Sequence, residues 1–267
     1  MHELLEPLLE RPQASGILLD IDGTLAPITG RAEDASVPSA TRDLLAALAG
    51  RYRLVACLSG RRALDARRVV GLDSISYVGN HGFEYLRPGA EEPETPPALA
   101  RHARRVEDFA AAAFTPALRE LGVRLEDKHA IWSFHWRQAP DERAAREQLE
   151  RIAADARDEG LVPHWGRKVL EIRPPLAHDK GTALEALVRA EELERALYVG
   201  DDTTDLDAFR KLRELRTAGT LADAVCIGVG SEEAPAELEQ EADALVEGPE
   251  GVAELMRALA KEPATAH

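Results

Sequence analysis

Two aspartates separated by one residue, Asp20 and Asp22, stand where the apolar run of residues 16–21 meets Gly23. Such a pair can divide the work of phosphate transfer. One carboxylate attacks phosphorus and forms an acyl phosphate, while the other gives a proton to the leaving alcohol and later takes one from water. Gly23 permits a tight turn that brings both carboxylates to one cleft. The structural alternative is a plain polar turn, for which Asp-Gly is an ordinary signal.

A serine and a lysine further along the chain have the chemistry to hold an anion. Ser59 and Gly60 follow the apolar run of residues 54–58 and offer a hydroxyl and backbone amides before a predicted helix. That arrangement suits an oxyanion. Lys180 precedes another predicted helix, where its ammonium group can balance a nucleophile and a phosphate. The alternatives are a serine N-cap and a solvated lysine.

Three aspartates crowd the segment that follows the apolar run of residues 196–199. Asp201, Asp202 and Asp205 would repel one another unless a cation bound between them. Capping of the next helix accounts for Asp205 alone and leaves the other two unexplained. The segment therefore predicts a metal site.

These residues follow elements that alternate along both ends of the chain. Short apolar runs alternate with segments of helical periodicity, which is typical of a parallel sheet covered by helices on both faces. The polar sets led by Asp20, Ser59 and Asp201 end different strands, and ligands bind at that edge of such sheets. Predicted strands cover residues 16–21, 54–58, 75–78, 196–199, 224–229 and 244–246, and predicted helices cover residues 39–49, 62–70, 181–189, 205–212 and 252–259.

The middle of the chain has a different pattern. Residues 87–97 are rich in proline and glutamate and predict a loop or linker. A helix–strand–strand pattern then occurs twice, which predicts a small α+β module over residues 100–173. The core is expected to contain residues 1–99 and 174–267. Within the module the predicted helices are 99–121 and 141–159, and the predicted strands are 123–127, 130–136, 161–165 and 168–173, with the second hairpin turning at Gly166-Arg167.

The composition limits the classes of protein to which the chain can belong. With 45% hydrophobic residues in 267 positions, it has ample material for a packed core. Its formal net charge of -15 disfavours nucleic acid as a partner, because no excess of lysine and arginine is left to neutralise backbone phosphates. An anionic substrate then needs a local cation and a few basic groups at its site.

Other features concern location and assembly. No apolar run approaches the ~20 residues needed to cross a bilayer. The first residues carry acids and prolines where a signal peptide has basic residues and a long apolar stretch. Cys57 and Cys226 stand in apolar runs and are expected to be buried small hydrophobes. We expect a cytoplasmic monomer that binds a small molecule, with no membrane or nucleic-acid partner.

In the order Asp-x-Asp-Gly-Thr, Ser, Lys and Gly-Asp-Asp, these features resemble the four motifs of the haloacid dehalogenase superfamily of phosphotransferases. The resemblance covers nearly the whole chain and implies an α/β fold, with a Rossmann-like parallel-sheet core and an inserted α+β cap domain. It implies that Asp20 is the nucleophile and a Mg²⁺ ligand, and that Asp22 is the acid/base and offers its backbone carbonyl to the metal. The remaining implied roles are Asp201 as a metal ligand, Asp202 and Asp205 as supporting residues, and Thr24, Ser59, Gly60 and Lys180 as phosphate-binding residues.

The predicted module carries candidate recognition residues on its strands. Alternation along residues 130–136 places its aromatic side chains on one face, where they are expected to form the module's own core. The other face is polar and suits a ligand with many hydroxyl groups, although plain solvated charges have the same pattern. The aromatic face contains Trp132, Phe134 and Trp136; the polar faces contain Ser133, His135 and Arg137 on one strand, and Arg167, Val169, Glu171 and Arg173 on another.

A narrower resemblance is to the trehalose-6-phosphate phosphatase family. It rests on GNHGFE at residues 79–84, LEDKHAIWSFHWR at 125–137, GRKVLEIRP at 166–174, and the strings KGTAL and GDDTTDLDAF. The resemblance implies hydrolysis of trehalose 6-phosphate to trehalose and inorganic phosphate. It implies substrate contacts from Asn80, His81, Gly82, Glu126, Lys128, Arg137, Arg167 and Glu171.

Two positions depart from that family's pattern. Arg167 stands where lysine is more usual, which keeps the charge but changes its geometry. Leu206 stands where glutamate is common, so one supporting contact near the metal is lost. Other substrates remain open, namely sucrose phosphate, glucosylglycerol phosphate or mannosylphosphoglycerate. So do a phosphomutase and a non-catalytic sugar-phosphate sensor, although a sensor would not need the pair Asp20 and Asp22.

Overall fold

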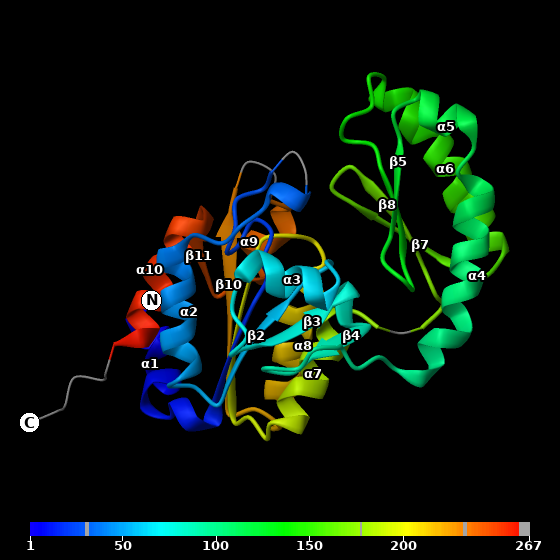
Figure 1. Cartoon of the computed structure of the whole chain (residues 1–267). Coiled ribbons are helices and arrows are strands. Elements are labelled where there is room, and N and C mark those ends of the chain that lie inside the picture. The colour runs from blue at the N-terminus through cyan, green and yellow to red at the C-terminus, as the bar shows by residue number, and fades with distance from the viewer. Residues whose placement is uncertain (30–31, 177, 232–233, 262–267) are drawn as a thin grey trace, which may run out of the picture. The chain divides into compact units, whose positions relative to one another are not determined.

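The chain forms two compact units (Figure 1). The first contains Met1–Glu94 and His178–His267, and the second contains Thr95–Ala177, so the second is inserted into the first along the chain. The predicted module boundaries, residues 100 and 173, lie a few positions inside the second unit, and its role as a cap stays a prediction. The structure is a computed structural model and describes residues 1–29, 32–176, 178–231 and 234–261.

Seven strands of the described residues form one sheet in the first unit. Their order is β11-β10-β9-β1-β2-β3-β4, so the first strand of the chain lies in the middle of the sheet. Neighbouring strands are parallel except β3 and β4, which are antiparallel. The strands are β1 (Ser15–Leu19), β2 (Leu54–Leu58), β3 (Ser76–Gly79), β4 (Glu84–Leu86), β9 (Arg195–Gly200), β10 (Asp223–Gly230) and β11 (Ala244–Glu247).

Helices cover both faces of this sheet. Successive side chains of each strand point to opposite faces, so a strand such as β1 contributes to two apolar clusters. On one face, Ile17 and Leu19 belong to an apolar cluster with α1, α2, α3 and α10. On the other face, Leu18 clusters with α7, α8 and α9. The chain therefore has the predicted α/β fold with a Rossmann-like parallel core. The helices are α1 (His2–Glu10), α2 (Ser39–Ala49), α3 (Ala63–Val70), α7 (Lys180–Ala190), α8 (Asp205–Thr217), α9 (Ala236–Glu241) and α10 (Gly248–Ala260).

The second unit has a four-stranded antiparallel sheet in the order β5-β6-β8-β7. One face is apolar, since Phe134, Trp136 and Leu170 cluster with α4, α5 and α6. The aromatic stripe is thus the unit's own core, as the alternation predicts. The elements are α4 (Pro97–Ala113), α5 (Pro116–Glu120), β5 (Arg124–Asp127), β6 (Trp132–His135), α6 (Glu142–Asp158), β7 (Val162–Gly166) and β8 (Val169–Arg173).

The structure differs from the sequence expectation in several local elements. The single helix predicted over residues 99–121 is wrong. It is divided into α4 and α5, because Pro116 starts a new helix and Thr115 before it is extended. The second hairpin turns at Arg167 and Lys168, one residue later than predicted, and Lys168 adopts a left-handed φ of 58°. The elements α1, β4 and α9 are not predicted from the sequence.

Two simpler expectations are tested by the same structure. Cys57 and Cys226 are buried and carry no disulfide. In the described ranges, none of the helices combines the length and apolar character that a membrane crossing requires.

Candidate active site

The carboxyl end of β1 brings Asp20 next to a buried lysine. Asp20 donates its backbone N–H to the carbonyl of Val199 at 2.9 Å, which continues the parallel pairing of β1 and β9 one residue past the strand. The Nζ atom of Lys180 donates to Asp20 Oδ1 at 2.6 Å, and both side chains are almost fully buried. Lys180 is the first residue of α7, whose start is fixed by a capping box between Asp179 and Thr182.

Asp205 connects this ion pair to the loop after β9. Its Oδ1 accepts hydrogen bonds from Lys180 Nζ and from the Tyr198 hydroxyl, each at 2.6 Å. Its Oδ2 accepts from the backbone N–H groups of Asp201 and Asp202, each at 2.9 Å. Four donors thus surround one carboxylate. This arrangement fits the supporting role expected for Asp205 better than direct metal ligation.

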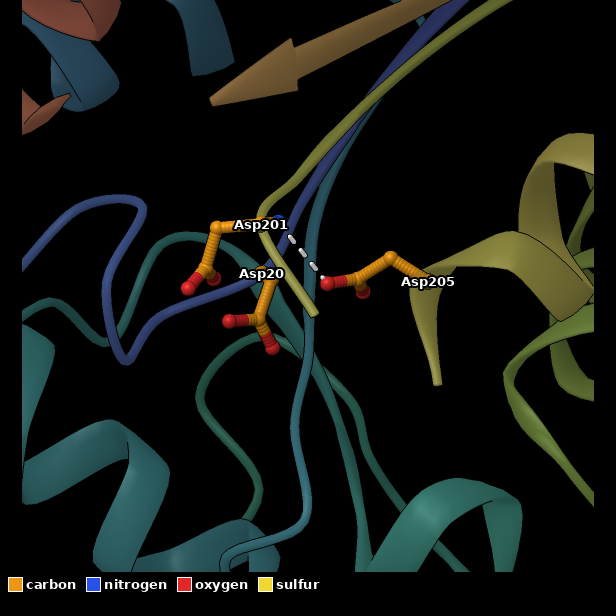
Figure 2. Close-up of side chains that lie close together, drawn as sticks. All are labelled: Asp20, Asp201 and Asp205. Carbon is orange, nitrogen blue, oxygen red and sulfur yellow. Dashed lines mark hydrogen bonds between the residues drawn. The ribbon is translucent and has the colours of Figure 1, made fainter. Parts of the chain in front are cut away.

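Three buried carboxylates converge at this edge of the sheet. Figure 2 shows Asp20 and Asp201 side by side, with Asp205 reaching in from the start of α8. One oxygen from each lies within 4.8 Å of the others. Burial raises the pKa of Asp20, and Lys180 opposes the shift while the charges of Asp205 and Asp201 add to it, so that the pKa lies well above its ordinary value. Among the described residues, Lys180 is the one ammonium group that is hydrogen-bonded to this cluster, which leaves the three carboxylates with excess negative charge.

A divalent cation fits that excess and the donor set. Carboxylate and carbonyl oxygens are the ligands that hard cations prefer. Gly23 brings the turn after Asp22 so close to Asp201 that a Cβ on Gly23 would lie 2.1 Å from Asp201 Oδ2. Its φ of 94° would also strain a larger residue. Thr24 donates its hydroxyl to Asp201 Oδ1 at 3.1 Å, so this phosphate-binding candidate contacts the metal-site candidate.

Asp22 has a different environment from Asp20. Its side chain is 38% exposed, and it pairs with the guanidinium of Arg61. Arg61 Nε donates to Asp22 Oδ2 at 2.7 Å, and Arg61 Nη2 donates to Oδ1 at 2.6 Å. The two carboxylates of the Asp-x-Asp pair therefore have separate cations and separate access to water, as a division of labour requires.

The candidate phosphate loop lies between β2 and α3. Ser59 is buried, and its hydroxyl accepts a hydrogen bond from the backbone N–H of Arg61 at 3.1 Å. The ring of His81 approaches Gly60 closely, because a Cβ on Gly60 would lie 2.6 Å from His81 Nε2. The neighbouring backbone is unusual: Asn80 and His81 both have left-handed φ values, 50° and 54°. Gly82 completes this turn with φ 111°.

Glu84 fastens the turn to the phosphate loop. Its buried carboxylate accepts from the backbone N–H of Ala63, at the start of α3, and from the Asn80 side chain, each at 2.7 Å. Strained backbone persists only where its surroundings fix it. Glu84 supplies part of that restraint, and the signal that could have found it is the GNHGFE string itself.

The family of the chain follows from a comparison with models of known protein families. Residues 18–243 match the family described as trehalose-phosphatase. The chain belongs to the trehalose-phosphatase family. The narrower resemblance inferred from its strings is therefore confirmed.

The chain is also similar to two bacterial proteins, one of which is a trehalose-phosphate phosphatase. The chain is 37% identical over 205 residues to an uncharacterized glycosyl hydrolase of Mycobacterium tuberculosis, which covers 74% of this chain and 15% of that protein. It is 34% identical over 215 residues to the trehalose-phosphate phosphatase of Mycolicibacterium paratuberculosis, covering 74% of this chain and 51% of that protein. The chain thus spans about half the length of that phosphatase. The structure of the C-terminal domain of trehalose-6-phosphate phosphatase from C. albicans matches in fold, with a TM-score of 0.78, 22% identity, and 97% and 96% of the two chains covered.

The second unit of this trehalose-phosphatase family member gathers part of its predicted recognition set. Glu126, Ser133 and Glu171 pair across β5, β6 and β8 in one row. Glu171 is buried and accepts hydrogen bonds from Lys128 Nζ at 3.0 Å and from Arg173, at 3.0 Å to Nε and 2.6 Å to Nη2. Within this unit, the structure therefore brings Lys128 and Glu171 together.

The other predicted residues of this unit lie in separate pairs. Glu126 Oε2 lies 2.6 Å from His135 Nε2. Arg137 Nη2 donates to the backbone carbonyl of Arg167 at 3.4 Å. Arg167 lies in the turn between β7 and β8, as predicted, and its place beside Glu171 stays a prediction.

Sequence reasoning gave no role to three residues that contact the site: Arg61, Glu84 and Tyr198. Arg61 directly follows Gly60 in the sequence, but spacing suggests no partner for it. Tyr198 has the one polar side chain among the buried residues of β9, and that contrast was its only signal.

Proposed function

We propose that this member of the trehalose-phosphatase family hydrolyses trehalose 6-phosphate to trehalose and inorganic phosphate, as a step of trehalose biosynthesis. The observation that carries the proposal is the buried group of Asp20, Lys180 and Asp205 with Asp22 two residues beyond the nucleophile. A protein that only senses a sugar phosphate needs no such nucleophile. Family membership supports the substrate.

In the first step, Asp20 attacks the phosphorus of the substrate. Lys180 holds Oδ1, so the attack comes from Oδ2, and the new Asp20 Oδ2–P bond replaces the bond between phosphorus and the sugar oxygen. Asp22 gives its proton to the departing sugar oxygen, which leaves as a hydroxyl group of trehalose. Lys180 and the amides near Ser59 and Gly60 balance the charge of the phosphoryl group.

In the second step, water attacks the phosphorus of phosphorylated Asp20. Asp22 takes a proton from this water as the new O–P bond forms and the Asp20 Oδ2–P bond breaks. The products are inorganic phosphate and the carboxylate of Asp20. The partial exposure of Asp22 gives it the access to water that this step needs.

We propose Mg²⁺ as the cation of the site. The carboxylates of Asp20 and Asp201 and the backbone carbonyl of Asp22 would hold it, with Asp202 and Asp205 supporting the loop. When bound, the ion neutralises the cluster's excess charge and polarises a phosphoryl oxygen. Leu206 is buried in an apolar cluster. The chain therefore lacks the carboxylate that the family commonly has at this position.

We further propose that the second unit acts as a cap and recognises the sugar. Its row of Glu126, Ser133 and Glu171, with the neighbouring Lys128, offers donors and acceptors suited to many hydroxyl groups. Asn80, His81, Gly82, Arg137 and Arg167 complete the proposed substrate set. A cytoplasmic location and a monomeric state belong to this proposal and rest on the sequence expectation alone.

The test is phosphate release from a panel of sugar phosphates with Mg²⁺. Trehalose 6-phosphate and glucose 6-phosphate carry the same phosphorylated glucose, so only contacts to the second glucose can separate them. Two charge-assisted hydrogen bonds, at about 1.5–3 kcal/mol each, amount to roughly a hundredfold or more in kcat/KM. Equal efficiency on both compounds would refute the trehalose assignment. Release of phosphate from none of the panel would refute the phosphatase.

A further inference from the structure

Arg61 binds Asp22, the proposed acid/base of the site, through two nitrogens of its guanidinium. The two hydrogen bonds to Asp22, at 2.6 and 2.7 Å, form a bidentate pair. This geometry fixes the plane of a carboxylate as well as its position. Lys180 holds the nucleophile Asp20 by a single hydrogen bond to Oδ1, which does not fix the plane of that carboxylate.

The backbone of Arg61 is itself held at two points. Its N–H donates to the Ser59 hydroxyl at 3.1 Å, and its carbonyl accepts from the N–H of Asn80 at 2.7 Å. Both partners belong to the candidate phosphate loop and the turn beside it. The reach from this backbone to Asp22 is therefore set by the same elements that would receive the phosphate.

The pair has partial access to solvent. The Arg61 side chain is 11% exposed and that of Asp22 is 38% exposed, so solvent screens part of their attraction. A bidentate pair can still add to stability. The fixed orientation of the carboxylate is what the two-point contact adds to that.

We propose that Arg61 is a positioning residue for the second half of the reaction, the hydrolysis of phosphorylated Asp20. The inference rests on the proposed function. Because Arg61 donates to both oxygens of Asp22, it fixes the orientation of the carboxylate that takes a proton from water in this step. In this step the water oxygen bonds to phosphorus, the Asp20–phosphorus bond breaks, and the water proton passes to Asp22.

This role predicts a particular kinetic signature. The ratio kcat/KM reports only the steps through release of the alcohol, whereas kcat also contains the hydrolysis of the phosphorylated enzyme. With p-nitrophenyl phosphate, whose leaving group needs no proton from Asp22, loss of Arg61 should therefore lower kcat and KM together and leave kcat/KM nearly unchanged. Phosphorylated Asp20 should accumulate and give a burst of alcohol release.

The experiment compares the full chain with its Arg61→Gln and Arg61→Lys variants in Mg²⁺, using p-nitrophenyl phosphate in a rapid-mixing assay. We expect kcat to fall about tenfold to a hundredfold in Arg61→Gln, with a burst approaching one p-nitrophenol per enzyme. Arg61→Lys keeps the charge but not the two-point contact, so its loss should be intermediate. Arg68→Gln is the matched control, because Arg68 lies on the following helix, α3, in an exposed pair with Asp65; its kinetics should not change.

A double-mutant cycle with Asp22→Asn separates positioning from any other effect. Arg61→Gln should slow the hydrolysis of the isolated phosphorylated enzyme when Asp22 is present. In the Asp22→Asn background, where an amide faces the water in place of the carboxylate, the same change should slow it by less than about twofold.

Three outcomes would overturn the inference while leaving the phosphatase intact. They are a fall in kcat/KM equal to the fall in kcat, the absence of a burst, and an equal effect of Arg61→Gln with and without Asp22. The first would make Arg61 a substrate-binding residue instead. An unmodified chain that releases phosphate neither from p-nitrophenyl phosphate nor from any sugar phosphate would overturn the proposed function and this inference together.

Discussion

The core edge and the polar face of the second unit are both rich in buried charge, but they balance it differently. At the core edge, Asp20, Asp201 and Asp205 face a single ammonium group, Lys180. On the second unit, the carboxylate of Glu171 has basic partners on both of its oxygens. The core edge therefore favours an added cation, while Glu171 is neutralised by residues of its own unit.

This contrast separates chemistry from recognition. In the proposed function, the unbalanced carboxylates hold the metal and transfer the phosphate that every phosphate ester carries. The balanced polar face would present donors and acceptors to uncharged hydroxyl groups. Changes at the core edge should thus affect all esters alike, and changes on the second unit should affect only the sugar substrate.

The most severe test of this division is Asp20→Asn. An amide does not form the acyl phosphate, so turnover of both trehalose 6-phosphate and p-nitrophenyl phosphate should fall to background. The fold should persist, because Lys180 keeps its bond to Asp205. Phosphate release and thermal unfolding are measured together. Asp22→Asn is the companion variant, and it should retain slow turnover with phosphorylated Asp20 accumulating. Substantial activity in Asp20→Asn would mean that another group attacks phosphorus.

Removal of the metal should abolish turnover as Asp20→Asn does, but reversibly. A chelator should abolish phosphate release, and Mg²⁺ should restore it. The excess charge at Asp20, Asp201 and Asp205 should also make the protein melt at a lower temperature without the metal. Saturation at about a hundred times Kd contributes about 2.7 kcal/mol. Asp201→Asn should weaken this response to Mg²⁺. A melting temperature independent of Mg²⁺, with full activity in chelator, would remove the metal from the mechanism.

A change at Glu171 should impair hydrolysis of the sugar substrate and leave hydrolysis of a small phosphate ester nearly unchanged. Glu171→Ala removes the acceptor shared by Lys128 and Arg173. We expect kcat/KM for trehalose 6-phosphate to fall by about a hundredfold, since contacts to charged groups contribute about 1.5–3 kcal/mol each. Turnover of p-nitrophenyl phosphate should barely change.

Two further variants serve as controls for this prediction. Glu171→Gln keeps the shape and should lose less, and Glu147→Gln, in an exposed pair with Arg143 on the same unit, should lose nothing. An equal loss on both esters in Glu171→Ala would place Glu171 in the general chemistry and contradict the division.

A smaller loss, shared by all esters, is expected at Tyr198. Tyr198→Phe removes one donor from Asp205 and leaves Lys180 and two amides in place. We expect kcat/KM to fall about tenfold on both esters, as one hydrogen bond to a charged group predicts. Tyr52→Phe is the matched control, because its buried hydroxyl donates to the Leu259 carbonyl at 3.0 Å. Both variants should lose stability, and only Tyr198→Phe should lose activity.

The long buried strands of the core could be predicted from the sequence, whereas the short strand β4 could not. The strands β1, β2, β9 and β10 are continuous apolar runs, because both of their faces are buried, and that signal is strong. Polar residues just after them must meet at one edge. Short elements gave no such signal: β4 is three residues long and contains the buried Glu84.

Side-chain pairings were harder to predict than positions. Spacing places Asp22 and Arg61 at the same edge but says nothing of their bidentate contact, which depends on the backbone of Arg61 being held by Ser59 and Asn80. In the second unit the hairpin turn lies one residue later than predicted, so Gly166 belongs to β7 and Lys168 belongs to the turn. The alternation of the neighbouring strand was predicted correctly, because its aromatic residues fix which face is buried.

The mildest prediction concerns the edge of the polar face, where Glu126 meets His135. Burial raises the pKa of Glu126, but the hydrogen bond from His135 and the charge of Lys128 outweigh it and hold the pKa below its ordinary value. A carboxyl group whose pKa is lower in the folded state stabilises the fold above its unfolded pKa, about 4.3, and loses this contribution as the pH falls through the folded value. The Glu126 side chain is 39% exposed, so the effect is reduced by screening. Glu126→Gln should therefore lower the melting temperature by about 2 °C or less near pH 6. Thermal unfolding of both proteins from pH 6 down to pH 3 checks the sign: the gap between them should close toward acid. A gap that stays constant or widens would show that the pair with His135 does not depend on the ionised carboxylate.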